Sequence, residues 1–158
     1  MPLSRYAPLV VCTLLVAGCV TETALPESSI SFSRSTCLGS CPAYSMELYS
    51  DGRYVWNGRS HVSVAGTRRG RMTADAYRLA LHLTSEARIE EFRDNYEGGA
   101  DCATWTTDQQ TVVIGLRNSS GTKTITHYLG CEGFSRQENL LQLESALERA
   151  MNIGKFTR

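Results

Sequence analysis

Apolar and polar residues alternate through much of the chain after residue 29. Ile30, Phe32 and Arg34 alternate with serines, and residues 44–48 repeat the same period of two. This period is typical of β-strands with one buried face. We therefore predict four strands, over residues 30–35, 44–48, 53–58 and 61–71.

Asp51-Gly52, between the second and third predicted strands, indicates a β-hairpin with a two-residue type I′ turn, because glycine adopts the positive φ that this turn needs. Such a turn places an aliphatic row on one face of the hairpin and an aromatic row on the other. The expected cross-strand pairs are Tyr49 with Tyr54, Leu48 with Val55, and Glu47 with Trp56.

Apolar residues recur at helical spacing in two later segments. Thr73 should cap the first helix by accepting a backbone hydrogen bond, and Asp75 suits its first turn. Ser135 and Glu138 have the spacing of a capping box for the second helix, which Gly154 should end. The expected buried faces are Ala76, Leu79, Ala80, Leu83 and Ala87, then Leu140, Leu143, Leu147, Ala150 and Met151.

Between the helices we expect a loop over residues 95–110 and two strands, 112–116 and 123–129, joined by a turn at 118–121. The element order is then ββββ-α-ββ-α. This order predicts an α+β fold, in which two helices pack on one face of a mainly antiparallel, disulfide-stapled sheet.

The first eighteen residues have the parts of an export signal: a positive charge at Arg5, an apolar run over residues 9–18, and then Cys19. The run is about half the roughly 20 residues of a membrane-spanning helix. Val16-Ala17-Gly18-Cys19 resembles a lipobox, whose cysteine thiol takes diacylglycerol before the signal is removed. An ordinary secretory signal with an incidental Cys19 is the alternative.

The lipobox resemblance implies a signal peptide over residues 1–18, a lipidated tether over 19–29 and one α+β domain over 30–158. Fatty acyl chains such as palmitate on Cys19, in the diacylglycerol and on the new amino group, would anchor the protein to the bacterial cell envelope. Val20 stands where aspartate would favour the inner membrane, so we expect outer-membrane attachment facing the periplasm.

Length and charge narrow the function classes. Removing residues 1–18 leaves a chain long enough for one domain with a core. The whole chain has 16 basic and 16 acidic residues, and only Arg5 leaves with the signal. The near-neutral charge gives no support for nucleic-acid binding.

Four of the six cysteines remain after Cys12 leaves with the signal and Cys19 takes the lipid. Export places them in an oxidising space, where thiols usually pair. Three pairings are possible, and we favour the one in which each bond joins a local loop. The favoured bonds are Cys37–Cys41 and Cys102–Cys131.

Two other roles compete for the same cysteines. Cys37, Cys41, His127 and Cys131 together supply a Cys₃His set of the kind that zinc accepts. A redox dithiol is a further alternative. It is disfavoured because Pro42 and a strand pattern follow Cys41, whereas reactive thiols usually lie at a helix N-terminus.

Residues 36–44 (TCLGSCPAY), followed by Asp51-Gly52 and by residues 56–58 (WNG), resemble the signature of domain-of-unknown-function family 6438. The resemblance covers roughly residues 30–151, and Leu38 stands where members often carry phenylalanine. It implies the fold and an envelope location. It implies no activity.

The signature also predicts a rigid, exposed knuckle over residues 37–41, since Gly39 permits a tight loop and Pro42 stiffens its exit. The knuckle is either a structural staple or a contact for a ligand or partner. The contact residues would be Leu38, Gly39, Ser40, Pro42 and Tyr44.

Catalytic candidates are weak. The sequence has no common hydrolase motif, and the three histidines, His61, His82 and His127, share none. Asp94, Asp101 and Asp108 could form an acidic pocket with Tyr96, although such loops are usually only solvated. We expect no catalytic residue, no metal and no cofactor other than the lipid.

One basic group stands out, and Arg53 is a further candidate member. It could contact anionic lipid headgroups or envelope phosphates, or simply protect a solvated strand edge. Its members are Arg59, Arg68, Arg69 and Arg71.

The sequence as a whole predicts a membrane-anchored, non-enzymatic envelope lipoprotein that binds a protein or cell-wall partner or supports an assembly. The rival hypothesis is a redox or zinc protein centred on the cysteines.

Overall fold

The computed structural model describes residues 24–98 and 101–158, so the predicted signal peptide and Cys19 lie outside the described residues. The strands are β1 (Ser29–Arg34), β2 (Ala43–Tyr49), β3 (Arg53–Ser60), β4 (Gly66–Arg71), β5 (Asn95–Tyr96), β6 (Thr104–Trp105), β7 (Thr111–Asn118), β8 (Gly121–Tyr128) and β9 (Cys131–Glu132). The helices are α1 (Ala74–Glu86), the 3₁₀ turn η1 (Ile89–Glu91), α2 (Gln137–Ala150) and α3 (Gly154–Thr157).

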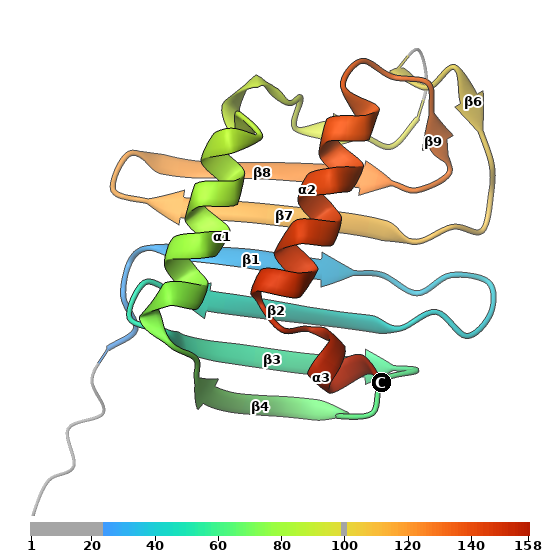
Figure 1. The fold of residues 1–158 in the computed structure, drawn as a ribbon. Helices are drawn as coiled ribbons and strands as arrows, with labels where there is room; N and C mark the ends of the chain where they lie inside the picture. Colours follow the sequence, from blue (N-terminus) through green and yellow to red (C-terminus); the bar gives the residue numbers. More distant parts are fainter. Residues whose placement is uncertain (1–23, 99–100) are drawn as a thin grey trace, which may run out of the picture.

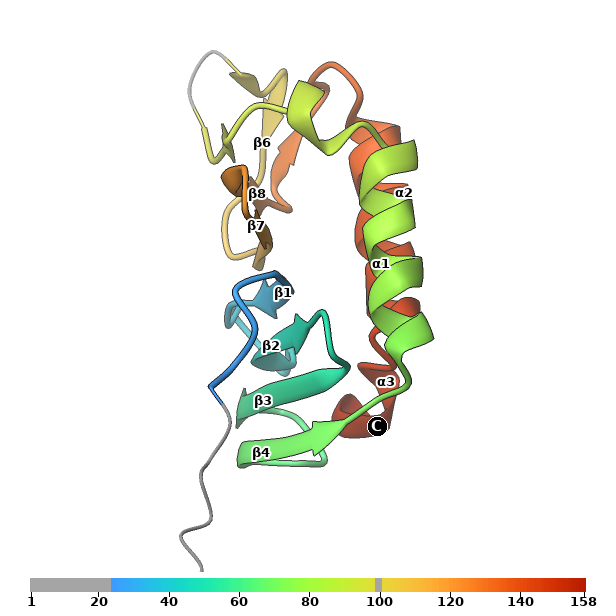
Figure 2. The same cartoon turned by 90° about the vertical axis from the view of Figure 1, so that its left-hand side faces the viewer.

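Seven strands form one sheet in the order β4-β3-β2-β1-β7-β8-β5, and β6 pairs with β9 beside it. Only the short β5 pairs in parallel; the other neighbours are antiparallel. Figures 1 and 2 show α1 and α2 side by side on one face and the other face without a helix. The predicted α+β architecture is confirmed.

The core lies between α2, α1 and the inner face of the sheet. Strand β1 is central, because it pairs with β2 on one side and with β7 on the other. Ile30 and Phe32 of this strand are fully buried, as are Leu140 and Leu147 of α2. No described helix has the length and apolar character needed to cross a bilayer.

The β2–β3 hairpin differs from the prediction by one residue in register. Leu48 pairs with Tyr54 and Met46 with Trp56, so the loop has three residues and not two. Gly52 lies at φ +86°, and a side chain there would meet the Met72 carbonyl oxygen at 2.5 Å. A three-residue loop with glycine in the left-handed region is the next most common hairpin connection.

The register change moves side chains between faces, because successive residues of a strand point to opposite sides. Trp56 and Tyr54 therefore share the helix-covered face with Met46 and Leu48, and no separate aromatic face exists on this hairpin. Trp56 is fully buried and stacks on Phe156 of α3, with ring centroids 4.7 Å apart.

Thr73 is the N-cap of α1, as predicted, but it makes no side-chain capping bond. Other predicted element ends were wrong. Arg136, at φ +64°, stands at the α2 N-cap in place of the Ser135 capping box. Strand β4 begins only at Gly66, because residues 61–65 form a loop. Gly154 starts α3 and does not end the helical region.

The predicted apolar face of α1 is confirmed at Ala80, which is buried, and at Ala76, Leu83 and Ala87, which pack half-buried against the core, but its centre lies nearer Tyr77 and Thr84 than predicted. Tyr77, Ala80 and Thr84 are its buried residues, whereas Leu79 is 48% exposed. Thr84 satisfies its hydroxyl by donating to the Leu81 carbonyl at 2.7 Å, which lets a polar residue occupy the buried face. The predicted face of α2 is confirmed at Leu140, Leu143, Leu147 and Met151.

Candidate functional site

The knuckle, residues 37–41, connects β1 to β2 at the end of the sheet away from the N-terminal segment (Figure 1). Cys37 and Cys41 form a disulfide across it, with Cα atoms 5.7 Å apart. Leu38 is 81% exposed, the largest value among the exposed large hydrophobic residues of the described chain, and Gly39 and Ser40 are exposed beside it. Gly39 has φ +131°, which favours glycine at the tip.

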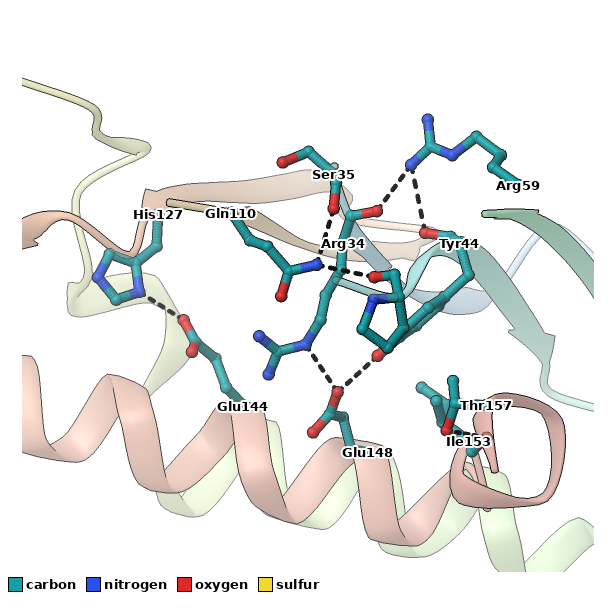
Figure 3. Close-up of polar contacts among 11 residues, drawn as sticks. Arg34, Ser35, Tyr44, Arg59, Gln110, His127, Glu144, Glu148, Ile153 and Thr157 are labelled. Atoms are coloured by element: carbon teal, nitrogen blue, oxygen red, sulfur yellow. Dashed lines mark hydrogen bonds and ion pairs between the residues drawn. The ribbon is translucent and has the colours of Figure 1, made fainter. Parts of the chain in front are cut away.

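Gln110 fixes both ends of the knuckle from below. Its buried amide donates to the Ser35 carbonyl at 2.8 Å and to the Pro42 carbonyl at 2.7 Å, as Figure 3 shows. The Leu38 backbone N–H donates to the Asp108 carbonyl at 3.2 Å. These bonds hold the exposed leucine on a preorganised frame.

Arg59 provides a second clamp at the same place. Its guanidinium donates to the Arg34 carbonyl at 2.8 Å and to the Tyr44 carbonyl at 3.4 Å (Figure 3). Both acceptors flank the knuckle on β1 and β2. This arginine, which the sequence grouped with an anion-binding cluster, therefore supports the loop.

The second disulfide, Cys102–Cys131, closes a 29-residue separation, with Cα atoms 5.0 Å apart. It ties the segment before β6 to β9. Trp105 of β6 is 47% exposed and packs on Tyr128 with ring centroids 4.3 Å apart. The cysteine pairing is thus the one that the sequence favoured.

A polar cluster lies under α2, behind the knuckle. Glu148 of α2 accepts bonds from Arg34 at 2.8 Å and from the Tyr44 hydroxyl at 2.5 Å (Figure 3). Burial, and then the hydrogen bond to Glu148, raise the pKa of Tyr44 far above its usual value. The pKa of Arg34 is also raised: burial lowers it, but the bond and charge of Glu148 outweigh that effect.

One helical turn earlier, Glu144 pairs with His127 of β8. Their Nδ1 and Oε1 atoms are 2.7 Å apart, and both side chains are almost fully buried. Tyr96 and Phe134 pack edge-on against the imidazole, and its Nε2 atom has no partner among the described residues. This pair is enclosed in the core beneath α2.

The structure separates most of the predicted site residues. Tyr44 was expected in the knuckle contact, but it is 1% exposed and points under α2. The strand register places Arg69 and Arg71 on the uncovered face of the sheet and Arg68 on the face that the helices cover. Arg59 lies at the opposite end of β3 from the pair formed by Arg53 and Arg71.

The other candidates also lie apart. Asp94 pairs with Lys123 and Asp101 with Arg93, while the Asp108 carbonyl contacts the knuckle, so the three aspartates form no shared pocket. His61 lies in the loop before β4, and His82 pairs with Glu86 on the surface of α1. Within residues 24–98 and 101–158, no three His, Cys, Asp or Glu side chains are grouped to hold a metal ion.

Sequence reasoning missed Gln110, Glu148 and Trp105. A lone glutamine or glutamate carries no motif, and their partners lie 68 to 114 residues away along the chain. The pairing of β1 with both β2 and β7 brings Gln110 to its partners, and the packing of α2 on the sheet brings Glu148 to Arg34 and Tyr44.

Comparison with curated proteins gives no match to this chain. Comparison with family models gives a match over residues 28–151, to the family described as "Domain of unknown function (DUF6438)". The match spans well over half of the chain and includes both disulfides, the knuckle and Gln110. The chain therefore belongs to the DUF6438 family.

Proposed function

We propose that this protein is a lipid-anchored lipoprotein of the bacterial cell envelope, held through Cys19, whose domain is a non-enzymatic binding module. The knuckle is its contact site, and the partner is an envelope protein with an apolar pocket for Leu38. The one observation that carries this proposal is the exposure of Leu38 on a loop clamped by a disulfide, Gln110 and Arg59.

An exposed leucine contributes nothing to the core, yet this one is held on a rigid frame. Preorganisation lowers the entropic cost of association, and a buried apolar anchor surrounded by a polar rim is a common centre of protein interfaces. Trp105 would extend the contact. It lies in the same segment as Asp108, whose carbonyl accepts a hydrogen bond from the Leu38 backbone N–H.

The position of the knuckle also suits an anchored binder. Strand β1 begins beside the N-terminal segment and ends at the knuckle, and its six residues span about 20 Å at 3.3 Å per residue. A chain attached through its amino end would thus present the knuckle away from the membrane.

The proposal is tested by photocrosslinking in the native host, with a photoreactive residue at position 40. We expect one envelope protein to be captured, and Leu38→Ala to abolish its capture. The matched control is Leu79→Ala, which truncates an exposed leucine on α1.

The captured protein is then purified and titrated. We expect Leu38→Ala to weaken its affinity at least tenfold, as for an interface anchor, and Leu79→Ala to leave it unchanged. Capture that does not depend on Leu38, or turnover of an envelope substrate by the purified domain, would contradict the proposal.

A further inference from the structure

Basic residues gather where the N-terminal segment enters the fold. Residues 51–71 contain five arginines and one acidic residue, Asp51, although the mature chain is nearly neutral. Three of them, Arg53, Arg69 and Arg71, lie at the N-terminal side of the sheet on its uncovered face, and we call these three the basic corner. Charge is therefore unevenly distributed over this protein.

The basic corner has charge to offer a ligand. Arg53 forms a salt bridge with Asp51, whereas neither Arg69 nor Arg71 has a salt bridge to any described residue. Arg69 and Arg71 are both exposed. The Arg71 guanidinium donates to the backbone carbonyl of Asp51, whose carboxylate forms its salt bridge with Arg53 and not with Arg71.

The described chain begins at this same corner. The Arg53 guanidinium donates to the Ala24 carbonyl at 2.6 Å, and Figure 2 shows the start of the described chain, in blue, on the side of the sheet away from the helices. Cys19 precedes Ala24 by five residues, which span about 18 Å at most. A bilayer that holds Cys19 must lie within that distance of Ala24.

A hollow of about 380 Å³ opens between this segment and strands β3 and β4. Arg53 and Arg69 are its only charged lining residues, and Leu25, 48% exposed, supplies an apolar edge. Cationic and apolar groups side by side suit the interface of an anionic bilayer, where phosphate meets acyl chain.

On the basis of the proposed anchor at Cys19, we infer that the basic corner lies against the anionic phospholipid headgroups of the membrane that holds the protein. The contact orients the domain, so that β1 directs the knuckle away from the bilayer. Protection of the edge strand β4 from aggregation explains exposed arginines there, but it explains neither the charged hollow nor its place beside the tether.

The test uses the mature chain, residues 19–158, with Cys19→Ala, so that binding is measured without any acyl chain. Vesicles of phosphatidylcholine with about 30% phosphatidylglycerol, a composition chosen to give a strongly negative surface, are compared with pure phosphatidylcholine by flotation. We expect binding only to the anionic vesicles, and its loss at high salt because exposed charges are then screened.

Arg69→Glu with Arg71→Glu should weaken binding about 30-fold or more, since each basic residue near an anionic surface contributes about fivefold. The matched control is Arg78→Glu with Arg88→Glu, which makes the same charge change at exposed positions on the helical side. Leu25→Asp is a third variant, outside any strand, and should weaken binding without altering the fold.

Equal binding to both vesicle types, no binding to the anionic ones, or equal losses in the two double variants would overturn the inference. If the arginines served only to protect the edge strand β4, the chain would not bind the anionic vesicles. Because the tested chain carries no lipid, these results do not depend on the anchor. Acylation of Cys19 in the native protein is measured separately. Its result tests the proposed function and not the binding measured with the vesicles.

Discussion

Glu148 shows how a single side chain on α2 supports the strand ends beside the knuckle. It accepts from both Arg34 and Tyr44, which come from β1 and β2. Hydrogen bonds to a charged partner contribute more than neutral ones, and a buried donor left without its acceptor is costly. The cluster therefore fixes the two strands that frame the loop.

The raised pKa of Tyr44 predicts a loss of stability in alkali. The folded state holds this phenol neutral, whereas the unfolded tyrosine ionises near pH 10. Its stabilising contribution is thus complete below pH 10 and is lost as the pH rises above it. We expect the free energy of unfolding, measured with denaturant, to fall above pH 10.

Tyr44→Phe should make that alkaline decline shallower. Some slope should remain, since burial raises the pKa of Tyr49 and Tyr77 in the same direction. An unchanged slope in Tyr44→Phe would show that this phenol ionises equally in the folded and unfolded states.

Gln110→Ala should destabilise the fold and loosen the knuckle, because it leaves the Ser35 and Pro42 carbonyls without their donor. An unsatisfied buried polar group costs about 1–3 kcal/mol. Gln109→Ala is the control, since the neighbouring glutamine is exposed, and it should cost less than about 0.5 kcal/mol. Denaturant unfolding measures both; equal costs would refute the role of Gln110.

At the scale of elements, the two disulfides should differ in effect. Cys102 and Cys131 are 29 residues apart and Cys37 and Cys41 only four. On the chain-entropy model the longer loop contributes about 3.5 kcal/mol and the shorter about 2. Replacing Cys102 and Cys131 by alanine should therefore lower the melting temperature more than replacing Cys37 and Cys41. Loss of the Cys37–Cys41 bond should mainly weaken partner binding.

Calorimetry of the two double-alanine variants decides this point. Equal losses of melting temperature, or a larger loss for the knuckle pair, would show that the short disulfide does more for the fold than for the loop it closes.

The short helix α3 lies beyond the family match, which ends at residue 151, yet it belongs to the core. Phe156 is 5% exposed and stacks on Trp56 of β3. Phe156→Ala should cost about 3–5 kcal/mol, as expected for a buried phenylalanine. The exposed neighbour Lys155→Ala should cost little, and a similar loss in both variants by denaturant unfolding would contradict this packing.

The sequence predicted best those elements whose apolar residues recur with a regular period and are also buried. Strand β1 and helix α2 are of this kind, since their apolar positions are also their buried ones. The hairpin register was missed because Asp-Gly is compatible with loops of two or three residues. The close approach of Met72, twenty residues later, leaves no room for a side chain at Gly52.

At the scale of the whole molecule, the sequence predicted the layers and the knuckle but not what holds the knuckle. The cysteine spacing and Pro42 mark the loop locally. Its clamps are Arg59, which comes from β3, and Gln110, which directly precedes β7, and no local pattern indicates their partners. The pairing of β3 with β4 likewise places the arginines of the basic group at both ends and on both faces of the sheet.

If a lipid on Cys19 anchors the protein as we propose, the membrane and the basic corner lie at one side of the sheet and the knuckle lies at the other. This arrangement depends on the lipid at Cys19. The most direct test is mass spectrometry of the amino-terminal peptide from protein isolated from native membranes. We predict a first residue at Cys19 that bears diacylglycerol, and an unmodified Cys19 or an intact Met1 terminus would contradict the claim.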